Sequence, residues 1–274
     1  MTWFFFVLSL IVIGYLLDRE IYFYEGVHLG PRVQAWLYDR WSRKYDEGKR
    51  ESQRRDDEML AHPLLERLSD VPEPFVLDFA TGTGRLSAAL MNRTEFQGRI
   101  VALDLSQGML EQAASKLRPK LPRCDLLRHP SLPLPFPDAS FDVVCALEVL
   151  ELFPAMDEPL AEFARVLRPG GVFLTSRGTE DSGRRAKVKA VTEYRSLLER
   201  YGFEQIEVVK WWKLFDRTLA SKQGTSIPVG KKRLEDVLKC RACRQVEWEK
   251  KENSLRCRTC GRELTVTSEG IVLG

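Results

Sequence analysis

Short apolar runs separated by polar stretches recur through the middle of the chain. Phe75–Leu77, Ile100–Leu103, Val143–Leu147 and Val172–Thr175 are such runs, and Gln107–Leu117 lies between two of them with the length of a helix. Uninterrupted apolar runs of this length are typical of parallel strands that helices bury on both faces. The pattern therefore predicts an α/β fold around a mostly parallel sheet.

The pattern changes later in the chain. Glu193–Arg200 reads as a helix, and the glycine that follows shortly after it favours a helix C-terminus there. Phe203–Val209 and Leu214–Ala220 are two strand-like segments close together in sequence, which predicts a closing antiparallel hairpin. Residues 222–232 contain two glycines and Pro228, so they predict a linker.

The first residues form the most apolar stretch of the chain. Trp3–Leu17 carries no charge, is apolar on nearly every face of a helix and ends abruptly at Asp18. About seventeen uncharged residues at about 1.5 Å per residue reach roughly 25 Å, against about 30 Å for the hydrocarbon core of a bilayer. Local thinning of the bilayer, or an interfacial position of Ile21–Tyr24, makes up the difference. We therefore expect residues 1–24 to form a transmembrane anchor.

Two other interpretations of this segment are weaker. A cleaved signal peptide normally has a basic region before its apolar core and small residues at its cleavage site, and this segment has neither. A buried core helix is disfavoured because the segment is apolar on nearly every face at the very end of the chain. Positive charges that follow the segment favour a single-pass protein with the rest of the chain in the cytoplasm: Arg19, Arg32, Arg40, Arg43, Lys44, Lys49 and Arg50.

The turn after the first apolar strand carries the strongest chemical signal. Asp78 is followed by Gly82 and Gly84, and glycines at such a turn let a helix begin close to a ligand. A dinucleotide fingerprint needs a third glycine where this chain has Ser87, so a dehydrogenase is disfavoured. A second acid, Asp104, closes the next apolar strand 20 residues after Gly84. We therefore expect a small cofactor other than a dinucleotide at this turn.

This spacing resembles that of the class I S-adenosylmethionine (SAM) methyltransferases. Leu134–Asp142 is similar to the LPFPDxSFD segment of the group that includes enzymes of ubiquinone and menaquinone biosynthesis. Arg165–Gly171 is similar to the RVLxPGG turn before the fifth strand of these enzymes, and Tyr38–Asp46 resembles their N-terminal cap helix. The resemblance extends over about residues 36–222. It implies a Rossmann-like, seven-stranded sheet and SAM as the cofactor.

The resemblance also implies roles for the two acids. In the family, the acid at the position of Asp78 lies near the methionine end of the cofactor, and the acid at the position of Asp104 accepts hydrogen bonds from both ribose hydroxyls. A helix N-cap before Gln107 is the alternative role for Asp104. The cofactor-binding residues that the resemblance implies are Asp78, Phe79, Ala80, Thr81, Gly82, Gly84, Asp104, Leu105, Met109, Ser131 and Leu147.

Two positions depart from the family pattern. The acid that meets the adenine amino group in the family corresponds to Pro130, so Ser131, His129 or the nearby backbone would take its place. A lone histidine in such a loop is more often an ordinary exposed residue. Leu152 stands where many relatives carry a histidine, so any chemistry of that histidine is absent. The ribose and methionine contacts remain, and cofactor binding is still expected.

Methyl transfer from a sulfonium depends mainly on holding the acceptor in line with the methyl group, and a general base is not always needed. If the acceptor is a carbon acid or a hydroxyl, Glu148 and Glu151 are the available carboxylates, because they follow the fourth strand at the carboxyl edge of the sheet. Tyr45 in the cap helix would cover the cofactor, as the resemblance implies. These three residues are the candidate catalytic residues.

Four cysteines near the C-terminus have the spacing of a zinc ribbon. Cys240 and Cys243 form one CxxC pair, and Cys257 and Cys260 form a second after 13 intervening residues. Two such pairs give a closed tetrahedral site of four thiolates, which predicts a structural Zn²⁺. Two disulfides are the alternative, which a reducing cytosol disfavours.

Residues 236–274, after a linker at 223–235, resemble the small zinc-ribbon activator proteins that pair with tRNA and protein methyltransferases. The resemblance implies a ribbon that packs on its own catalytic domain or helps to recruit the substrate. An RNA-binding ribbon is the alternative, with Trp248 available for stacking and several arginines around the cysteine pairs: Arg241, Arg244, Arg256, Arg258 and Arg262.

Composition narrows the choice of function. The 274 residues are 44% apolar, enough for one α/β domain at 25–222 and a smaller unit, and 42 basic against 39 acidic residues argue against a large nucleic-acid footprint. The sequence therefore favours a membrane-anchored SAM-dependent methyltransferase with a lipophilic acceptor such as a quinone precursor or another lipid. An RNA or protein acceptor recruited by the ribbon, and a non-catalytic module with the same fold, are the alternatives.

Overall fold

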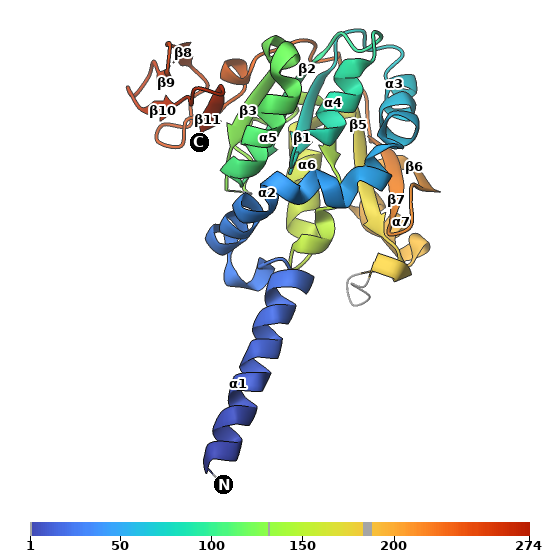
Figure 1. Cartoon of the computed structure of the whole chain (residues 1–274). Coiled ribbons are helices and arrows are strands. Elements are labelled where there is room, and N and C mark those ends of the chain that lie inside the picture. Colours follow the sequence, from blue (N-terminus) through green and yellow to red (C-terminus); the bar gives the residue numbers. More distant parts are fainter. Residues whose placement is uncertain (1, 131, 183–187) are drawn as a thin grey trace.

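The computed structural model describes residues 2–130, 132–182 and 188–274. Its centre is an eight-stranded sheet in the order β11-β3-β2-β1-β4-β5-β7-β6 (Figure 1). β7 runs antiparallel to both of its neighbours, and the other adjacent strands are parallel. The strands of this sheet are β1 (Phe75–Phe79), β2 (Arg99–Asp104), β3 (Cys124–Arg128), β4 (Phe141–Ala146), β5 (Leu167–Gly178), β6 (Phe203–Lys210), β7 (Phe215–Lys222) and β11 (Ile271–Leu273).

Helices cover both faces of this sheet, as the apolar runs predict. They are α2 (Pro31–Gln53), α3 (His62–Arg67), α4 (Arg85–Asn92), α5 (Gln107–Leu117), α6 (Asp157–Val166) and α7 (Val191–Arg200). Single turns of π-helix lie at Arg19–Phe23 and Asp57–Ala61, and 3-10 turns lie at Val27–Leu29, Arg118–Arg123, Leu150–Leu152, Glu180–Ser182 and Leu234–Asp236.

The side chains of β1 alternate between two hydrophobic layers. Val76 packs in one layer with residues of α3, α4 and α5, whereas Phe79 packs in the other with Phe163 of α6 and Tyr194 of α7. All five residues of β1 are buried, because helices cover this strand on both faces. The arrangement confirms the predicted α/β, Rossmann-like fold.

The fifth strand begins earlier than the sequence pattern indicates. The sequence pattern predicts a turn before this strand at Arg165–Gly171. In the structure, α6 ends within this segment at Val166, and β5 begins at the next residue, Leu167. The pairing of β4 with β5 is irregular between Phe141 and Val143, so the glycines lie in a distorted part of the strand. Close packing explains why position 171 is a glycine, because a Cβ there would lie 2.8 Å from the backbone oxygen of Asp142.

The C-terminal segment contributes the eighth strand. Ile271 and Val272 of β11 pair in parallel with Leu126 and Leu127 of β3, at what would otherwise be the edge of the expected seven-stranded sheet. A small antiparallel sheet precedes it, with β8 (Trp248–Lys250), β9 (Ser254–Cys257) and β10 (Glu263–Thr265) in the order β10-β9-β8. The sequence pattern misses β11 because three residues are too few to show a period.

Asp142 fastens the segment that connects the two sheets. Its buried carboxylate accepts hydrogen bonds from the backbone N–H groups of Val229 (2.8 Å) and Gly230 (3.0 Å), both in the predicted linker. It also accepts bonds from Phe75 N (3.0 Å) and from Nε of Arg168 (2.6 Å). The linker therefore follows a defined path past the amino ends of β1 and β4.

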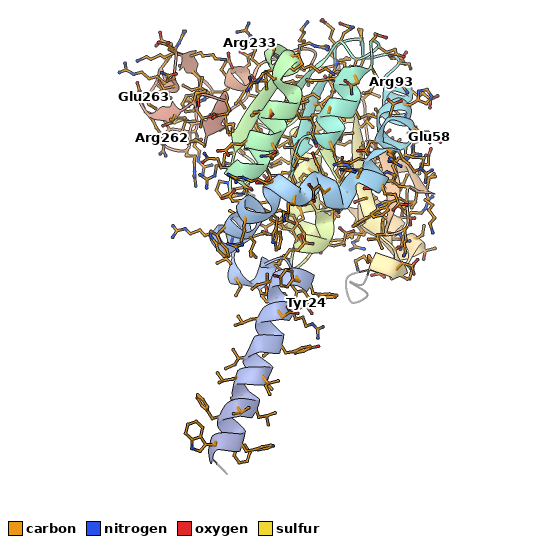
Figure 2. The ribbon with its side chains drawn as sticks, in the orientation of Figure 1. Tyr24, Glu58, Arg93, Arg233, Arg262 and Glu263 are labelled. Atoms are coloured by element: carbon orange, nitrogen blue, oxygen red, sulfur yellow. The ribbon has the colours of Figure 1, made fainter. Side chains whose placement is uncertain are left out.

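The N-terminal helix α1 (Thr2–Asp18) projects away from the rest of the protein, and its apolar side chains point outward all round (Figures 1 and 2). Trp3–Leu17 is exposed along its whole length. The membrane-spanning helix predicted for residues 1–24 is not found, because α1 ends after 17 residues and a π-helical turn follows it. Within the described residues, no helix is long and apolar enough to cross a membrane.

Candidate functional site

The turn between β1 and α4 uses its two glycines for different purposes. Gly82 has φ +55° and faces an open cavity, where an added Cβ would approach only the ring of Tyr45, at 4.0 Å. Gly84 has φ +74° and packs on α5, where an added Cβ would lie 3.1 Å from the Cβ of Ala113. The first glycine therefore leaves room for a ligand, and the second allows two helices to approach closely.

Asp78 holds this turn together from inside the protein. Its carboxylate accepts hydrogen bonds from the hydroxyls of Thr81 (2.7 Å) and Ser87 (2.6 Å). Burial raises the pKa of Asp78, although these two hydroxyls and the Ser87 backbone oppose the shift. Ser87, which replaces the third glycine of a dinucleotide fingerprint, thus has a structural reason to be a serine.

Asp104 ends β2 with its carboxylate at the start of the same turn. It accepts hydrogen bonds from the backbone N–H groups of Gly82 (2.8 Å) and Ser106 (2.9 Å). The N-cap of α5 is Ser106, whose hydroxyl accepts a bond from Met109 N (3.0 Å), so Asp104 is not needed as the cap. Burial raises the pKa of Asp104 to about 6, against the opposing effect of the two N–H groups.

A cavity of about 340 Å³ opens beside Asp104 at the carboxyl ends of β1, β2 and β4. Of the residues predicted to bind the cofactor, those that line it are Phe79, Ala80, Gly82, Asp104, Leu105, Met109 and Leu147. Asp78, Thr81 and Gly84 lie outside the lining, and Ser131 lies outside the described residues. The lining combines an acid, a glycine turn and apolar walls, which suits a nucleoside with a polar sugar and a flat aromatic base.

Other residues of this lining come from a segment that the sequence motifs do not mark. Val27, Pro31 and Gln34 close one side of the cavity, at and before the start of α2, next to Tyr38 of the predicted cap helix. Asp39 holds α2 in this position, because its carboxylate accepts bonds from Gly108 N (2.8 Å) and the hydroxyl of Ser106 (2.6 Å). The only sequence signal for this wall is its place just before the predicted cap helix.

The position expected for the adenine-binding acid is also in the lining. His129 and Pro130 both border the cavity, and the side chain of His129 is buried rather than exposed, contrary to the sequence expectation. Its Nε2 lies 3.2 Å from the carbonyl oxygen of Pro133. Burial lowers the pKa of His129, so the ring is neutral at physiological pH.

Glu148, a candidate catalytic residue, is tightly bound by cations. It pairs with Lys49 of α2 and with Arg85 of α4, whose Nη1 lies 3.0 Å from Oε1 of Glu148. Arg85 in turn pairs with Asp56 at 2.5 Å. The backbone of Glu148 also has φ +54°, which is uncommon for a residue other than glycine. Two cations on one carboxylate favour a structural and electrostatic role over that of a proton acceptor.

Glu151 and Tyr45 have different surroundings. Glu151 is buried, and its Oε1 accepts a hydrogen bond from Gly178 N (2.7 Å) at the end of β5. Tyr45 borders the cofactor cavity, and burial raises the pKa of its phenol well above the ordinary range, so the group stays protonated. The carboxylate of Glu151 is therefore held at the end of β5, outside the lining of this cavity, whereas the protonated phenol of Tyr45 is part of the lining.

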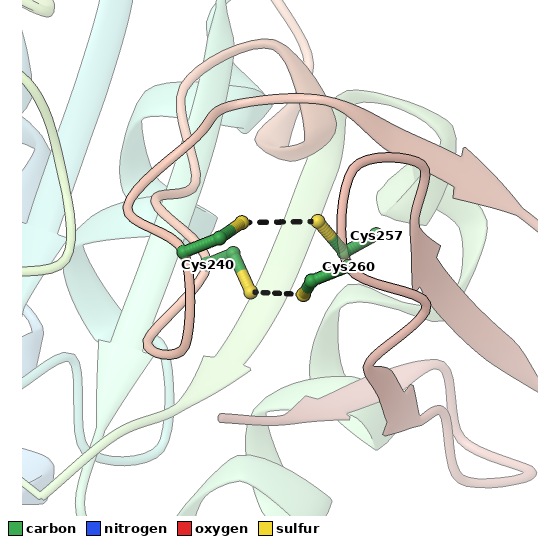
Figure 3. Close-up of side chains that lie close together, drawn as sticks. Cys240, Cys257 and Cys260 are labelled. Carbon is green, nitrogen blue, oxygen red and sulfur yellow. Dashed lines mark hydrogen bonds between the residues drawn. The ribbon is translucent and has the colours of Figure 1, made fainter.

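The four predicted zinc ligands come together in the C-terminal segment. The thiol sulfurs of Cys240, Cys243, Cys257 and Cys260 all lie within 4.8 Å of one another, and Figure 3 shows Cys240, Cys257 and Cys260 directed toward a common centre. Two of the sulfur pairs are separated by 3.6 Å, so neither pair is a disulfide, whose sulfurs lie about 2.05 Å apart. Four thiolates about 2.3 Å from one ion at tetrahedral angles lie about 3.8 Å apart, so the cluster fits Zn²⁺.

The features expected of an RNA-binding ribbon are only partly present. Trp248 is buried, and its Nε1 donates a hydrogen bond to the carbonyl oxygen of Leu238 (2.6 Å), so it is not available for base stacking. The arginines around the cysteine pairs are exposed, as expected of solvated side chains.

Comparison with known proteins agrees with the geometry of the cavity. Residues 76–171 match the family described as Methyltransferase domain. The chain is 40% identical over 98 residues to phthiotriol/phenolphthiotriol dimycocerosates methyltransferase of Mycobacterium tuberculosis, covering 36% of this chain and 35% of that protein. It is 30% identical over 141 residues to demethylmenaquinone methyltransferase of Lactococcus lactis subsp. lactis, covering 51% of this chain and 56% of the relative.

Among solved structures, a SAM-dependent methyltransferase from Aquifex aeolicus matches with a TM-score of 0.53 and 19% identity, covering 67% of this chain and 98% of that one. The chain spans about a third to about half of the length of the two curated relatives. The region that carries the cavity therefore matches the methyltransferase-domain family over residues 76–171 and shares the fold of a solved SAM-dependent methyltransferase.

Proposed function

We propose that this protein is a SAM-dependent methyltransferase. The observation that carries the proposal is the cavity at the carboxyl ends of β1, β2 and β4, with the Asp104 carboxylate on one side and α2 across its opening. In open α/β sheets, ligands bind outside the carboxyl ends of the strands, where this cavity lies. The matching family and the names of the relatives support the same activity.

The lining residues divide the work of holding the cofactor. Asp104 would accept hydrogen bonds from the two ribose hydroxyls, and Leu105 and Met109 offer an apolar surface for the base. Tyr45, across from Gly82, keeps water away from the methionine end. When bound, SAM supplies a methyl group that its sulfonium already activates for displacement. The protein then has mainly to hold the acceptor in line with that group.

We also propose that the acceptor is lipophilic and that α1 attaches the enzyme to a membrane. The apolar side chains of Trp3–Leu17 are exposed, which is unfavourable in water at about 25 cal/mol per Å² of apolar surface. Insertion of this segment into a bilayer removes the cost and raises the local concentration of lipid substrates. The basic residues after α1 favour the cytoplasmic side for the domain.

The relatives support this choice of acceptor. One is named for phthiotriol and phenolphthiotriol dimycocerosates and the other for demethylmenaquinone. For the C-terminal segment, the cysteine geometry supports a structural Zn²⁺ with no open position for catalysis. We propose that the zinc holds the ribbon in place against β3, through β11.

An acceptor bound through the ribbon, such as RNA or protein, is a second candidate, supported by the exposed arginines beside the cysteine pairs. The decisive test is methyl transfer from labelled SAM by the full chain, offered separately a membrane lipid extract and total RNA. Label in the lipid fraction alone supports the proposal. Label in RNA alone contradicts it, and absence of label and of SAM binding would favour a non-catalytic module.

Attachment to the membrane has its own test. Val7 and Ile11 lie one helical turn apart on α1, so the pair Val7→Lys and Ile11→Lys places two charges on one side of the helix. We expect the wild-type chain to float with phosphatidylcholine vesicles in a density gradient and the double variant to stay at the bottom. The matched control carries Lys at two exposed positions of α2, Glu47 and Glu51, and should float like the wild type.

A further inference from the structure

The cap helix α2 crosses the beginning of α5 beside the cofactor cavity (Figure 1). The two helices meet at Gly108, the second residue of α5, where an added Cβ would lie 3.0 Å from the Cα of Asp39. This distance is shorter than an ordinary contact between carbon atoms, so only a glycine lets the two backbones come so close. Tyr38, the residue before Asp39, lines the cavity. The crossing therefore also sets the position of the wall that α2 contributes.

Asp39 binds two donors at this crossing with a single oxygen. Its Oδ1 accepts hydrogen bonds from Gly108 N (2.8 Å) and from the hydroxyl of Ser106 (2.6 Å). Gly108 N is one of the first N–H groups of α5, which have no partner within their own helix. The helix dipole also favours a carboxylate at this end. Asp39 therefore caps α5 from a different helix.

Ser106 connects this contact to the cofactor cavity. Its buried hydroxyl donates to Asp39 and accepts a hydrogen bond from Met109 N (3.0 Å). Its backbone N–H donates to Oδ1 of Asp104 (2.9 Å), whereas Oδ2 of Asp104 accepts a bond from Gly82 N (2.8 Å). Each oxygen of the Asp104 carboxylate is thus held by one N–H group. The orientation of this carboxylate therefore depends on the position of Ser106.

If the cavity holds SAM, as proposed above, the orientation of Asp104 decides how well its carboxylate meets the two ribose hydroxyls. We propose that Asp39 is a positioning residue for cofactor binding, which acts through Ser106 to hold Asp104 in the orientation that accepts both hydroxyls. Asp39 lies outside the lining of the cavity, so its effect on SAM is indirect. SAM then binds with full affinity only while α2 is packed on the beginning of α5.

The test measures the SAM affinity of the full chain by equilibrium dialysis with labelled SAM. Asp39→Ala removes both hydrogen bonds and should raise the SAM Kd about tenfold. Asp39→Asn should raise it less than about threefold, because an amide oxygen can accept the same two bonds. Glu47→Ala removes an exposed carboxylate from the same helix, and this matched control should bind SAM like the wild type. An unchanged Kd for Asp39→Ala, or binding by Asp39→Asn as weak as that by Asp39→Ala, would overturn the inference.

A double-mutant cycle separates an effect through Asp104 from a general loosening of α2. In an Asp104→Asn background, Asp39→Ala should raise the SAM Kd less than about threefold, because the carboxylate that Asp39 positions is no longer present. A tenfold loss in both backgrounds would show that Asp39 acts independently of Asp104, which would overturn the inference while SAM binding by the wild type persists. Absence of SAM binding by the wild-type chain would instead overturn the proposed function.

Discussion

β1 is enclosed on both faces by apolar side chains, whereas the ribbon at 236–274 consists of three-residue and four-residue strands around four cysteines. The buried apolar residues of the ribbon, among them Trp248, Leu255 and Leu264, belong to a hydrophobic layer that the ribbon shares with the central sheet. A segment this small cannot bury enough surface to be stable, so the proposed metal would supply much of its folding free energy. The comparison teaches that a large core stabilises one region of this chain, whereas the other region would depend on the proposed metal site.

The largest effect should follow from breaking the metal site. Structural zinc sites contribute about 10 kcal/mol or more to the folding of small domains. We expect the wild-type chain to hold one equivalent of zinc and Cys257→Ser to hold none. The ribbon should then unfold while β1 to β7 stay folded, since residues of these strands and of the helices that cover them make up most of both hydrophobic layers, which the ribbon joins through a few residues such as Trp248 and Ile271. Hydrogen exchange would show loss of protection confined to β8, β9, β10 and β11.

Cys145→Ser is the matched control for this variant, because Cys145 is a buried core residue far from the cysteine cluster in sequence. It should keep its zinc. Zinc retained by Cys257→Ser, or metal-free wild-type protein, would show that the ribbon does not depend on this site.

The next largest effect tests the connection between the two regions. Asp142→Ala leaves the guanidinium of Arg168 buried without its carboxylate and removes the acceptor for Val229 N and Gly230 N. Breaking a buried pair in this way costs about 3–5 kcal/mol. Urea unfolding should show this loss, and Asp138→Ala, which removes an exposed partner of Arg165, should cost less than about 1 kcal/mol. A small loss for Asp142→Ala would mean that the linker is held by other contacts.

A smaller effect is expected at the cofactor cavity. Asp104→Ala removes the proposed acceptor of the ribose hydroxyls and should weaken SAM binding by about a hundredfold or more, as hydrogen bonds to a charged group contribute about 1.5–3 kcal/mol each. Equilibrium dialysis with labelled SAM measures this change. Asp125→Ala, on the adjacent strand β3 but outside the lining, is the control and should bind SAM normally.

The smallest effect concerns pH. The raised pKa of Asp104, about 6, means that its carboxyl group becomes protonated in the empty site as the pH falls through 6. A protonated carboxyl group accepts fewer hydrogen bonds from ribose, so the SAM Kd should rise up to about tenfold per pH unit below 6 and stay level above it. Asp104→Asn should lose this dependence. A flat profile in the wild type between pH 5 and 7 would contradict the proposed role of Asp104.

The sequence predicts the central region well because its signals are repeated. Buried strands such as Val143–Leu147 show continuous apolar runs, and the turn after Asp78 shows glycines at fixed spacing. The two CxxC pairs are an equally clear sequence signal for a metal site. Each of these signals depends on residues close together in sequence, which is why they could be found without the structure.

Features that depend on distant contacts could not be found in this way. The burial of His129 follows from the packing of its loop, and the bond from Trp248 to Leu238 follows from the fold of the ribbon. The pairing of β11 with β3 joins residues about 145 positions apart. The wall formed by Val27 and Pro31 depends on how α2 lies across the sheet, which no local motif encodes.

The central claim, that the cavity beside Asp104 holds SAM, is tested most directly by calorimetric titration of the full chain with SAM in mild detergent. We expect saturable binding to one site per chain, displaced by the demethylated product S-adenosylhomocysteine. No heat of binding with SAM at millimolar concentration, from protein that holds its zinc and is folded, would contradict the account.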